Sequence, residues 1–273
     1  MTTTLRASAL PLALLGAAAL ASACDLIEGV TATKIVSGIV IATPELKLTG
    51  SFDVKSETIA TAWIGQRDSP TSTAEPSPLT GVDVKLTTPG GTFALTEETS
   101  TPGVYLVTST SQSGLTYQAG ASYGLDALIQ GASYGNDGTA PPRLDAGSLT
   151  FTPTLGAGQL QGVRVHARNT ALTVQWPSTA GRYAYVSVLR AKPSAPTEPE
   201  LVFDNRPETA GEILSFVLGD PKSSIEIPGG TFATTGLYAV VVVAMNKGTP
   251  RSGTFSGSPM LVGSGAATLL SIE

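Results

Sequence analysis

The pentapeptide Gly-Ala-Ser-Tyr-Gly occurs twice, at 120–124 and 131–135, and each copy places a serine between two glycines. A serine of this pattern is a nucleophile when a buried strand runs directly into a helix and a strained turn exposes the hydroxyl. Ser122 and Ser133 instead lie in alternating, strand-like sequence, and no helical pattern follows either copy. The sequence therefore favours strand and turn positions for both serines.

The chain has one histidine, His166, in the alternating segment Val-Arg-Val-His-Ala-Arg. Its expected strand face also carries Arg164 and Arg168, so we expect that face to be solvated. Two flanking cations disfavour a further positive charge, which argues against a general base or a metal ligand there. With one histidine and one cysteine, Cys24, zinc sites and histidine-dependent triads lack the parts they need. We predict no catalytic residue, no metal site and no cofactor.

Carboxylates are the remaining chemical candidates, because two of them can hydrolyse a glycosidic bond without a histidine. The sequence does not show whether any two converge, so a carboxylate-dependent hydrolase is a less favoured alternative. Asn136-Asp137-Gly138 lacks the alternating acids of a calcium-binding loop and indicates a turn. The scattered acids are Glu97, Glu98, Asp126, Asp137, Asp145, Glu198, Glu200 and Asp204.

The segment before Cys24 has the pattern of a secretory leader. A polar start with one positive charge, Arg6, precedes an uncharged and mostly apolar run at 9–20. That run is shorter than the roughly 20 residues that a bilayer-spanning helix needs. Ala21-Ser22-Ala23 then supplies the small side chains that a signal peptidase requires. Ordinary cleavage would leave a free thiol at Cys24, and acylation of that thiol is the alternative.

Leu20-Ala21-Ser22-Ala23-Cys24 resembles the lipobox of bacterial lipoproteins, whose cysteine is acylated and becomes the first residue. A lone, unpaired cysteine in an exported chain otherwise needs an explanation. The resemblance implies a signal peptide at 1–23, a tether at 24–34 and membrane attachment through acyl chains on Cys24. Each buried methylene of those chains would contribute about 0.8 kcal/mol. We expect the cell envelope as the location, at the outer membrane or cell surface rather than the inner membrane.

The composition excludes some classes of partner. The formal net charge is −5, and it becomes −6 once the leader with Arg6 is removed. A mildly acidic chain without a basic cluster has no electrostatic footprint for nucleic acid. Hydrophobic residues make up 41% of the chain, enough to build a core and to argue against disorder.

Short segments rich in β-branched and aromatic residues recur between turn residues, and they predict an all-β fold. Two tandem antiparallel β-sandwich domains, of the immunoglobulin or fibronectin type III kind, would follow the signal peptide. We expect them at 35–150 and 158–273, and we expect the proline-bearing segment 66–80 to be an exposed, mobile loop. The clearest strand segments are 82–88, 103–109, 171–176 and 183–189.

The hexapeptide Pro-Gly-Gly-Thr-Phe-Ala occurs at 89–94 and again at 228–233. Because Pro-Gly-Gly favours turns and Thr-Phe favours strands, both copies predict a turn that leads into a strand. A duplicated sandwich is the alternative explanation.

In the C-terminal half, Trp176 ends an alternating strand, and the segment 236–248 reads Gly-Leu-Tyr-Ala-Val-Val-Val-Val-Ala-Met-Asn-Lys-Gly. Together they resemble a fibronectin type III domain over about 160–263. The resemblance implies that Trp176 lies in the core and that the hydroxyl of Tyr238 closes a corner. Because 236–248 is apolar on both faces, we expect it to be a central strand.

The N-terminal half carries Gly-Val-Asp-Val-Lys-Leu at 81–86 and Pro-Gly-Val-Tyr-Leu-Val at 102–107. This half resembles the small prealbumin-like or carboxypeptidase-regulatory-like sandwiches of exported bacterial proteins. The resemblance implies that Tyr105, Tyr123 and Leu125 point into the core.

The leading interpretation is a lipid-anchored envelope protein with a non-catalytic binding or structural role, its partner a protein or polysaccharide. An accessory subunit of an envelope transport or secretion assembly is one alternative. A carbohydrate-binding module is another, with Trp63, Tyr183 and Tyr185 as possible stacking faces. Ala184, Val186 and Val188 are the expected core face of their strand, which would leave both tyrosines near the surface. We expect Trp63 to be buried.

Replacing Cys24 by serine tests the predicted anchor. Cys24→Ser should abolish acylation and release the protein from membranes, because serine offers no thiol for the acyl chains. Fatty-acid labelling and membrane fractionation measure both effects. An unlabelled wild type whose mature N-terminus is an unmodified Cys24 would show that the lipobox interpretation is wrong.

Overall fold

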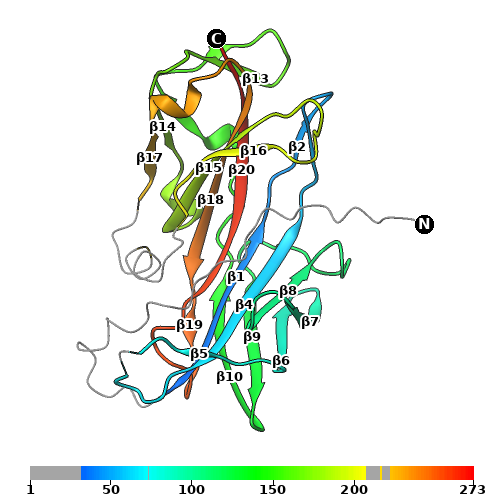
Figure 1. Ribbon diagram of the computed structural model, residues 1–273, viewed down its shortest axis with the longest axis vertical. Coiled ribbons are helices and arrows are strands. Elements are labelled where there is room, and N and C mark those ends of the chain that lie inside the picture. Colours follow the sequence, from blue (N-terminus) through cyan, green and yellow to red (C-terminus); the bar gives the residue numbers. More distant parts are fainter. Residues whose placement is uncertain (1–31, 73, 207–215, 217–221) are drawn as a thin grey trace.

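The computed structural model describes residues 32–72, 74–206, 216 and 222–273. In these residues the regular secondary structure is almost entirely β, which confirms the all-β prediction (Figure 1). No helix among them is long and apolar enough to cross a membrane. The strands are β1 (Lys34–Ala42), β2 (Leu46–Leu48), β3 (Phe52–Val54), β4 (Thr58–Gln66), β5 (Ser77–Pro78), β6 (Asp83–Thr88), β7 (Gly91–Glu97), β8 (Val104–Thr108), β9 (Ser122–Ile129), β10 (Ala132–Thr139), β11 (Thr150–Thr152), β12 (Gly156–Ala157), β13 (Val163–His166), β14 (Leu172–Gln175), β15 (Tyr183–Arg190), β16 (Glu200–Asp204), β17 (Ser224–Ile227), β18 (Gly236–Lys247), β19 (Thr249–Pro250) and β20 (Met260–Ile272). The 3₁₀ helices are η3 (Ala146–Ser148), η4 (Ser178–Ala180) and η5 (Gly229–Phe232).

One hydrogen-bonded sheet runs through both halves of the chain, in the order β16-β15-β18-β20-β1-β4-β8-β7-β6-β9-β10-β19. Most neighbours are antiparallel, but β20 has two parallel neighbours, β1 and β13. Strand β18 lies between β15 and β20, so the prediction of a central strand at 236–248 is confirmed.

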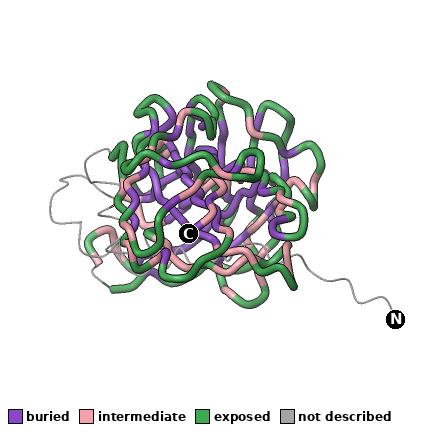
Figure 2. The backbone as a smooth tube through the Cα atoms, turned by 90° about the horizontal axis from the view of Figure 1, so that it is seen from above, coloured by how far each residue is buried: buried purple, intermediate pink, exposed green. Residues whose placement is uncertain are grey.

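Each half of the molecule is a sandwich with its own core. We call the first the N-terminal core; it lies between β1, β4 and β8 on one side and β6, β9 and β10 on the other. The second, the C-terminal core, lies between the β15-β18-β20 part of the large sheet and the separate sheet β11-β14-β17. Buried backbone accordingly fills the centre of the molecule, and exposed segments surround it (Figure 2).

The long strand β20 contributes to both cores from the same face. Its Met260 and Val262 lie in the N-terminal core, whereas Ala266 and Leu270 lie in the C-terminal core. Side chains of a strand alternate between its two faces, so these even-numbered residues all point to one side.

The opposite face of this part of the sheet is also covered. Leu261 of β20 and Val243 of β18 pack there with Leu46 and Phe52, which the short hairpin β2–β3 supplies. We call this cluster the shared core, because its members come from both halves of the chain.

Strand pairing crosses the expected boundary between 35–150 and 158–273. Residues Gly38–Ala42 of β1 pair with Met260–Ser264 of β20, and Asn136 and Asp137 of β10 pair with β19. The division into two domains stays a prediction, and the two segments share one sheet.

Buried tyrosines close corners in both halves through their hydroxyls. Tyr238 Oη donates to the carbonyl of Thr234 at 2.8 Å, which confirms the predicted corner. Tyr105 Oη donates to the carbonyl of Leu79 at 3.0 Å, and Tyr123 does the same at Thr116, at 3.2 Å. Tyr105, Tyr123 and Leu125 all lie in the N-terminal core, as predicted.

Both tryptophans are buried, as expected. Trp176 lies in the C-terminal core, and Trp63 packs with Ile35, Val104 and Phe255. Trp63 therefore offers no stacking face to a ligand.

Two glycines allow β10 to cross close to the end of β18. A Cβ atom on Gly248 would lie 2.2 Å from the carbonyl oxygen of Asp137, and one on Gly138 would lie 2.9 Å from Cγ2 of Val262. The backbones of the two halves therefore touch here, where neither side has room for a methyl group.

This contact makes Gly248→Ala a test of how the halves are joined. We expect a loss of about 1–3 kcal/mol in the free energy of unfolding, because the added methyl must displace backbone rather than a flexible side chain. Urea unfolding of the wild type and the variant measures the difference. Gly230→Ala is the control, since no atom lies within 4 Å of its added Cβ. Equal stability of the two variants would contradict the close contact.

Candidate functional site

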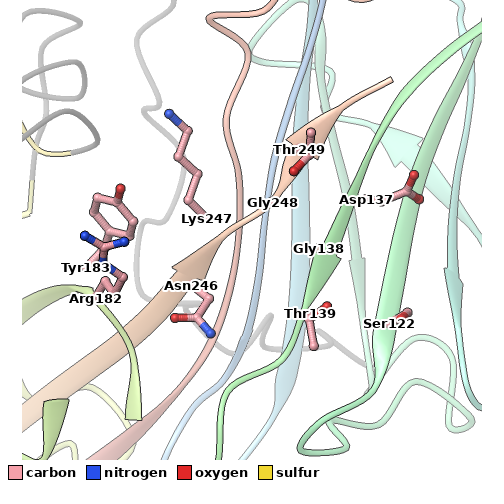
Figure 3. A pocket seen from close by; sticks show the side chains of 10 residues that line it. All are labelled: Ser122, Asp137, Gly138, Thr139, Arg182, Tyr183, Asn246, Lys247, Gly248 and Thr249. Atoms are coloured by element: carbon pink, nitrogen blue, oxygen red, sulfur yellow. The ribbon is translucent and has the colours of Figure 1, made fainter. Parts of the chain in front are cut away.

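A groove of about 760 Å³ lies where β9 and β10 of the N-terminal half meet the ends of β15 and β18. Figure 3 shows Arg182 and Tyr183 on one side, Ser122 and Thr139 on the other, and the chain from β18 to β19 between them. Its volume lies within the range of about 300–1,000 Å³ that is usual for ligand sites. Its lining is Ser122, Asp137, Gly138, Thr139, Arg182, Tyr183, Asn246, Lys247, Gly248 and Thr249.

Hydroxyl and amide groups dominate the lining. Ser122 and Thr139 are direct cross-strand partners of β9 and β10, so their side chains lie next to each other on one face. Thr249 is paired with Asp137 across β19 and β10, and Asn246 lies near the end of β18. Because strands carry these groups, their spacing is set by the sheet rather than by a loop.

Two cationic side chains, Arg182 and Lys247, line the groove. Arg182 directly precedes β15, and Lys247 is the last residue of β18, the strand that pairs with β15. Neither forms an ion pair with any residue that the structure describes. Surrounding protein removes part of the hydration of the Lys247 ammonium and lowers its pKa.

Asp137 brings a carboxylate to the groove, and Arg251 holds it. Arg251 Nε donates to Oδ2 of Asp137 at 2.8 Å, and the same guanidinium also pairs with Asp126. The hydrogen bonds from Arg251 hold the pKa of Asp137 below its ordinary value, and this pairing raises the pKa of Arg251. Of the scattered acids, Asp126 and Asp137 therefore do converge, with a cation between them. Sequence reasoning missed Arg251, because it lies 114 residues from Asp137 along the chain.

Tyr183 lines the groove, whereas Tyr185 does not. Tyr183 is half-buried and its ring lies tilted against Phe216, with 5.8 Å between the ring centroids. Tyr185 is buried in the shared core, and that burial raises the pKa of its hydroxyl. The expectation that both tyrosines lie near the surface is wrong for Tyr185. The reason is that the shared core covers the face of β15 that carries Tyr185, while Ala184, with the rest of the predicted core face, packs in the C-terminal core.

The structure separates the residues that could act as nucleophile and base. Ser122 begins β9 and lines the groove, whereas Ser133 lies exposed on β10 with its Oγ 3.4 Å from Oδ1 of Asp126. Both serines belong to a β-hairpin, so neither has the strand–turn–helix setting of a nucleophile, as expected from the sequence. Ser122 has no hydrogen-bonded base in the part of the chain that the structure describes.

His166 is buried, so the expected solvated face is wrong. Its imidazole packs edge-on against Phe232, with 5.0 Å between the ring centroids, and its Nε2 lies 2.8 Å from the carbonyl oxygen of Thr170. Strand β13 ends at His166, and the turn that follows brings the carbonyl of Thr170 back onto the ring. His166 is therefore buried although Arg164 and Arg168, expected on the same strand face, are exposed.

The predicted turn at Asn136-Asp137-Gly138 is wrong as well, because these residues lie inside β10. Tertiary contacts override the local preference for a turn. Asn136 is fully buried and its Nδ2 donates to the carbonyl of Val36, while Asp137 pairs with Arg251.

The other candidate acids have structural partners or lie apart from the groove. Glu97 accepts hydrogen bonds from the backbone N–H groups of Gly81 and Gly103. Asp145 caps η3. Glu200 pairs with Arg190, and Asp204 pairs with Arg206. Glu98 and Glu198 do not line the groove.

No group of three or more His, Cys, Asp or Glu side chains in the described ranges is arranged to hold a metal ion. Cys24 lies outside those ranges. Of the fourteen described residues of 66–80, seven are exposed and two, Arg67 and Pro76, are buried, so the expected exposure holds only in part. The Arg67 guanidinium lies 4.8 Å from the centre of the Phe255 ring, and Ser77–Pro78 pair with β4.

Comparisons with known proteins add little to this geometry. No known protein family matches the sequence, and a search of curated proteins finds no match. Among solved structures, the FN1–FN3 domains of chicken CNTN1 match 85% of this chain at 10% identity, with a TM-score of 0.19. The match covers 65% of that chain, just under two thirds of its length. A TM-score this low supports no conclusion about fold or function.

Arg251→Met tests the electrostatics of the groove wall. The pKa of Asp137 should rise toward its ordinary value of 3.8, because the hydrogen bonds and charge that lower it are removed. A carboxyl group with a lowered folded-state pKa stabilises the fold above its unfolded pKa and loses that contribution as the pH falls through the folded pKa. The variant should therefore be less stable than wild type at neutral pH, and the gap should narrow in acid.

Carbon NMR titration of Asp137 and urea unfolding across the acid range measure these effects. Arg190→Met is the control, because it removes an ion pair with Glu200 on β15 and β16, at the opposite end of the sheet order from β10. A stability gap that stays constant down to strong acid would contradict the role given to Arg251.

Proposed function

We propose that this protein is a lipid-anchored component of a cell envelope that binds a ligand, without catalysis, in the groove between its two halves. The observation that carries the proposal is the groove itself. Strands from both halves supply its hydrogen-bonding and charged side chains, and the sheet fixes their positions. Rigid scaffolds that present polar groups in this way suit recognition of a ligand.

The anchor rests on the sequence around Cys24. A thiol at that position, followed by a tether at 24–34, would leave the β-structure free to extend from the membrane surface. Strand β1 begins at Lys34, so the tether would lead directly into the centre of the large sheet. The anchor would therefore be joined to the sheet that both halves of the chain share.

The choice of binding over catalysis rests on the chemistry of the lining. Among the described residues Ser122 has no hydrogen-bonded base that would activate it, and His166 is buried among residues of the C-terminal half. Asp126 and Asp137 converge, but both are bound to Arg251, whereas a glycosidase needs one carboxyl protonated and the other free to react. These arrangements favour a site that holds a ligand and does not transform it.

Filling the groove tests the proposal. In the double variant Ser122→Leu/Thr139→Leu, two facing hydroxyls are replaced by larger apolar side chains, so any ligand of the groove should be excluded. The Cys24→Ser protein should co-sediment with insoluble envelope material from the native cells, and the double variant in the same background should not. Thr87→Leu/Thr92→Leu is the matched control, an exposed cross-strand pair of threonines on β6 and β7, and it should bind like wild type.

Two results would contradict the proposal. One is that the Cys24→Ser protein does not co-sediment with envelope material, or that the groove-filling variant still does. The other is turnover of ester or glycoside substrates that disappears in Ser122→Ala, Ser133→Ala or His166→Ala, which would make the protein an enzyme.

A further inference from the structure

We infer that the ligand of the groove is an acidic polysaccharide, a chain of sugar residues that carry carboxylate groups. This inference rests on the proposed function and assigns a chemical class to the ligand. Four features of the lining support it: hydroxyl and amide groups, a pair of cations, a neutralised carboxylate and a partly exposed aromatic ring.

Sugar hydroxyls are both donors and acceptors, and so are the polar groups of the lining. The hydroxyls of Ser122, Thr139 and Thr249 can donate or accept, and the amide of Asn246 offers both kinds of atom. Two of the hydroxyls are cross-strand neighbours, so they can bind adjacent hydroxyls of one sugar ring.

Arg182 and Lys247 give the groove its attraction for an anion. They come from neighbouring positions at the ends of paired strands, since β15 and β18 pair Tyr183 with Met245. An arginine can bind a carboxylate through two parallel hydrogen bonds, and a lysine adds a mobile point charge. Because successive side chains alternate between the faces of a strand, an acidic chain in the groove could engage Arg182 and Lys247 through different carboxylates.

Asp137 is the one acid among the described residues of the lining, and its charge does not cancel the attraction. Its oxygens already accept hydrogen bonds from Arg251 Nε and Nη2. The lining residues that the structure describes therefore carry two positive charges and one negative charge that is paired elsewhere, on a chain whose net charge is −5.

Tyr183 adds an apolar surface. Its half-buried ring borders the groove, and an aromatic face packs against the carbon-bound hydrogens of a sugar while the hydroxyl stays in water. Phe216 supports the ring from outside the lining.

An acidic peptide is the alternative anion, and the lining favours it less. Peptides gain affinity from pockets that take apolar side chains or from pairing with a free strand edge. Tyr183 is the main apolar side chain of the lining, and the edge strand at the groove, β19, has only two residues, too few to form a ladder with an added strand.

Calorimetric titration with three defined polymers tests the inference. Oligogalacturonate should bind the Cys24→Ser protein, a neutral glucose oligomer of equal length should bind much more weakly, and poly-glutamate should bind weakly or not at all. Binding of oligogalacturonate should weaken as salt screens the charges. Arg182→Gln and Lys247→Gln should each reduce the affinity about fivefold or more, as expected for loss of a charged hydrogen bond of about 1 kcal/mol or more. Tyr183→Leu should also reduce it.

Lys55→Gln is the control, because Lys55 is exposed and outside the groove. The inference is overturned if the neutral oligomer binds as well as the acidic one, or if poly-glutamate binds more tightly. It is also overturned if the acidic oligomer does not bind while groove-dependent sedimentation with envelope material persists. That last result would leave the proposed function standing, so failures of the two proposals are distinguishable.

Discussion

The backbone ladder of β20 is the interaction on which the rest of the structure depends. Its thirteen residues pair with β18 along nearly their whole length, with β1 at one end and with β13 at the other. One face of this strand enters the N-terminal core and then the C-terminal core, so a single element contributes to both. Displacing β20 would expose apolar surface and unpaired backbone groups in both halves at once.

The groove is a consequence of this shared sheet. Strands β9 and β10 reach the groove from the N-terminal sandwich, and β15 and β18 reach it from the C-terminal one. Close approach of the two backbones at Gly138 and Gly248 sets the floor, while the pairing of Arg251 with Asp126 and Asp137 fixes the wall of β10. A ligand there would contact both halves, so its binding energy would add to the contacts that hold them together.

The balance of charge in the groove differs from that of the chain as a whole. Mild overall acidity would repel an anion at long range, but salt screens that repulsion beyond about 8–10 Å. Within the groove, Arg182 and Lys247 would meet an anion at hydrogen-bond distance, where local charge decides recognition. The same short range explains why net charge, read from composition alone, could argue against a nucleic-acid partner without predicting this site.

The sequence by itself determined the β-class of the fold, because strand alternation and turn chemistry are local. The burial of Trp176 and the corner at Tyr238 followed from the resemblance of the C-terminal half to a fibronectin type III domain. The hexapeptide Pro-Gly-Gly-Thr-Phe-Ala shows that local sequence does not always decide local structure. At 89–94 it forms a turn that leads into strand β7, whereas at 228–233 it contains the 3₁₀ helix η5. The burial of His166 and Tyr185 was decided by contacts with distant elements. Tertiary structure alone brought Arg251 to Asp126 and Asp137, because partners more than a hundred residues apart meet only once the sheet has formed.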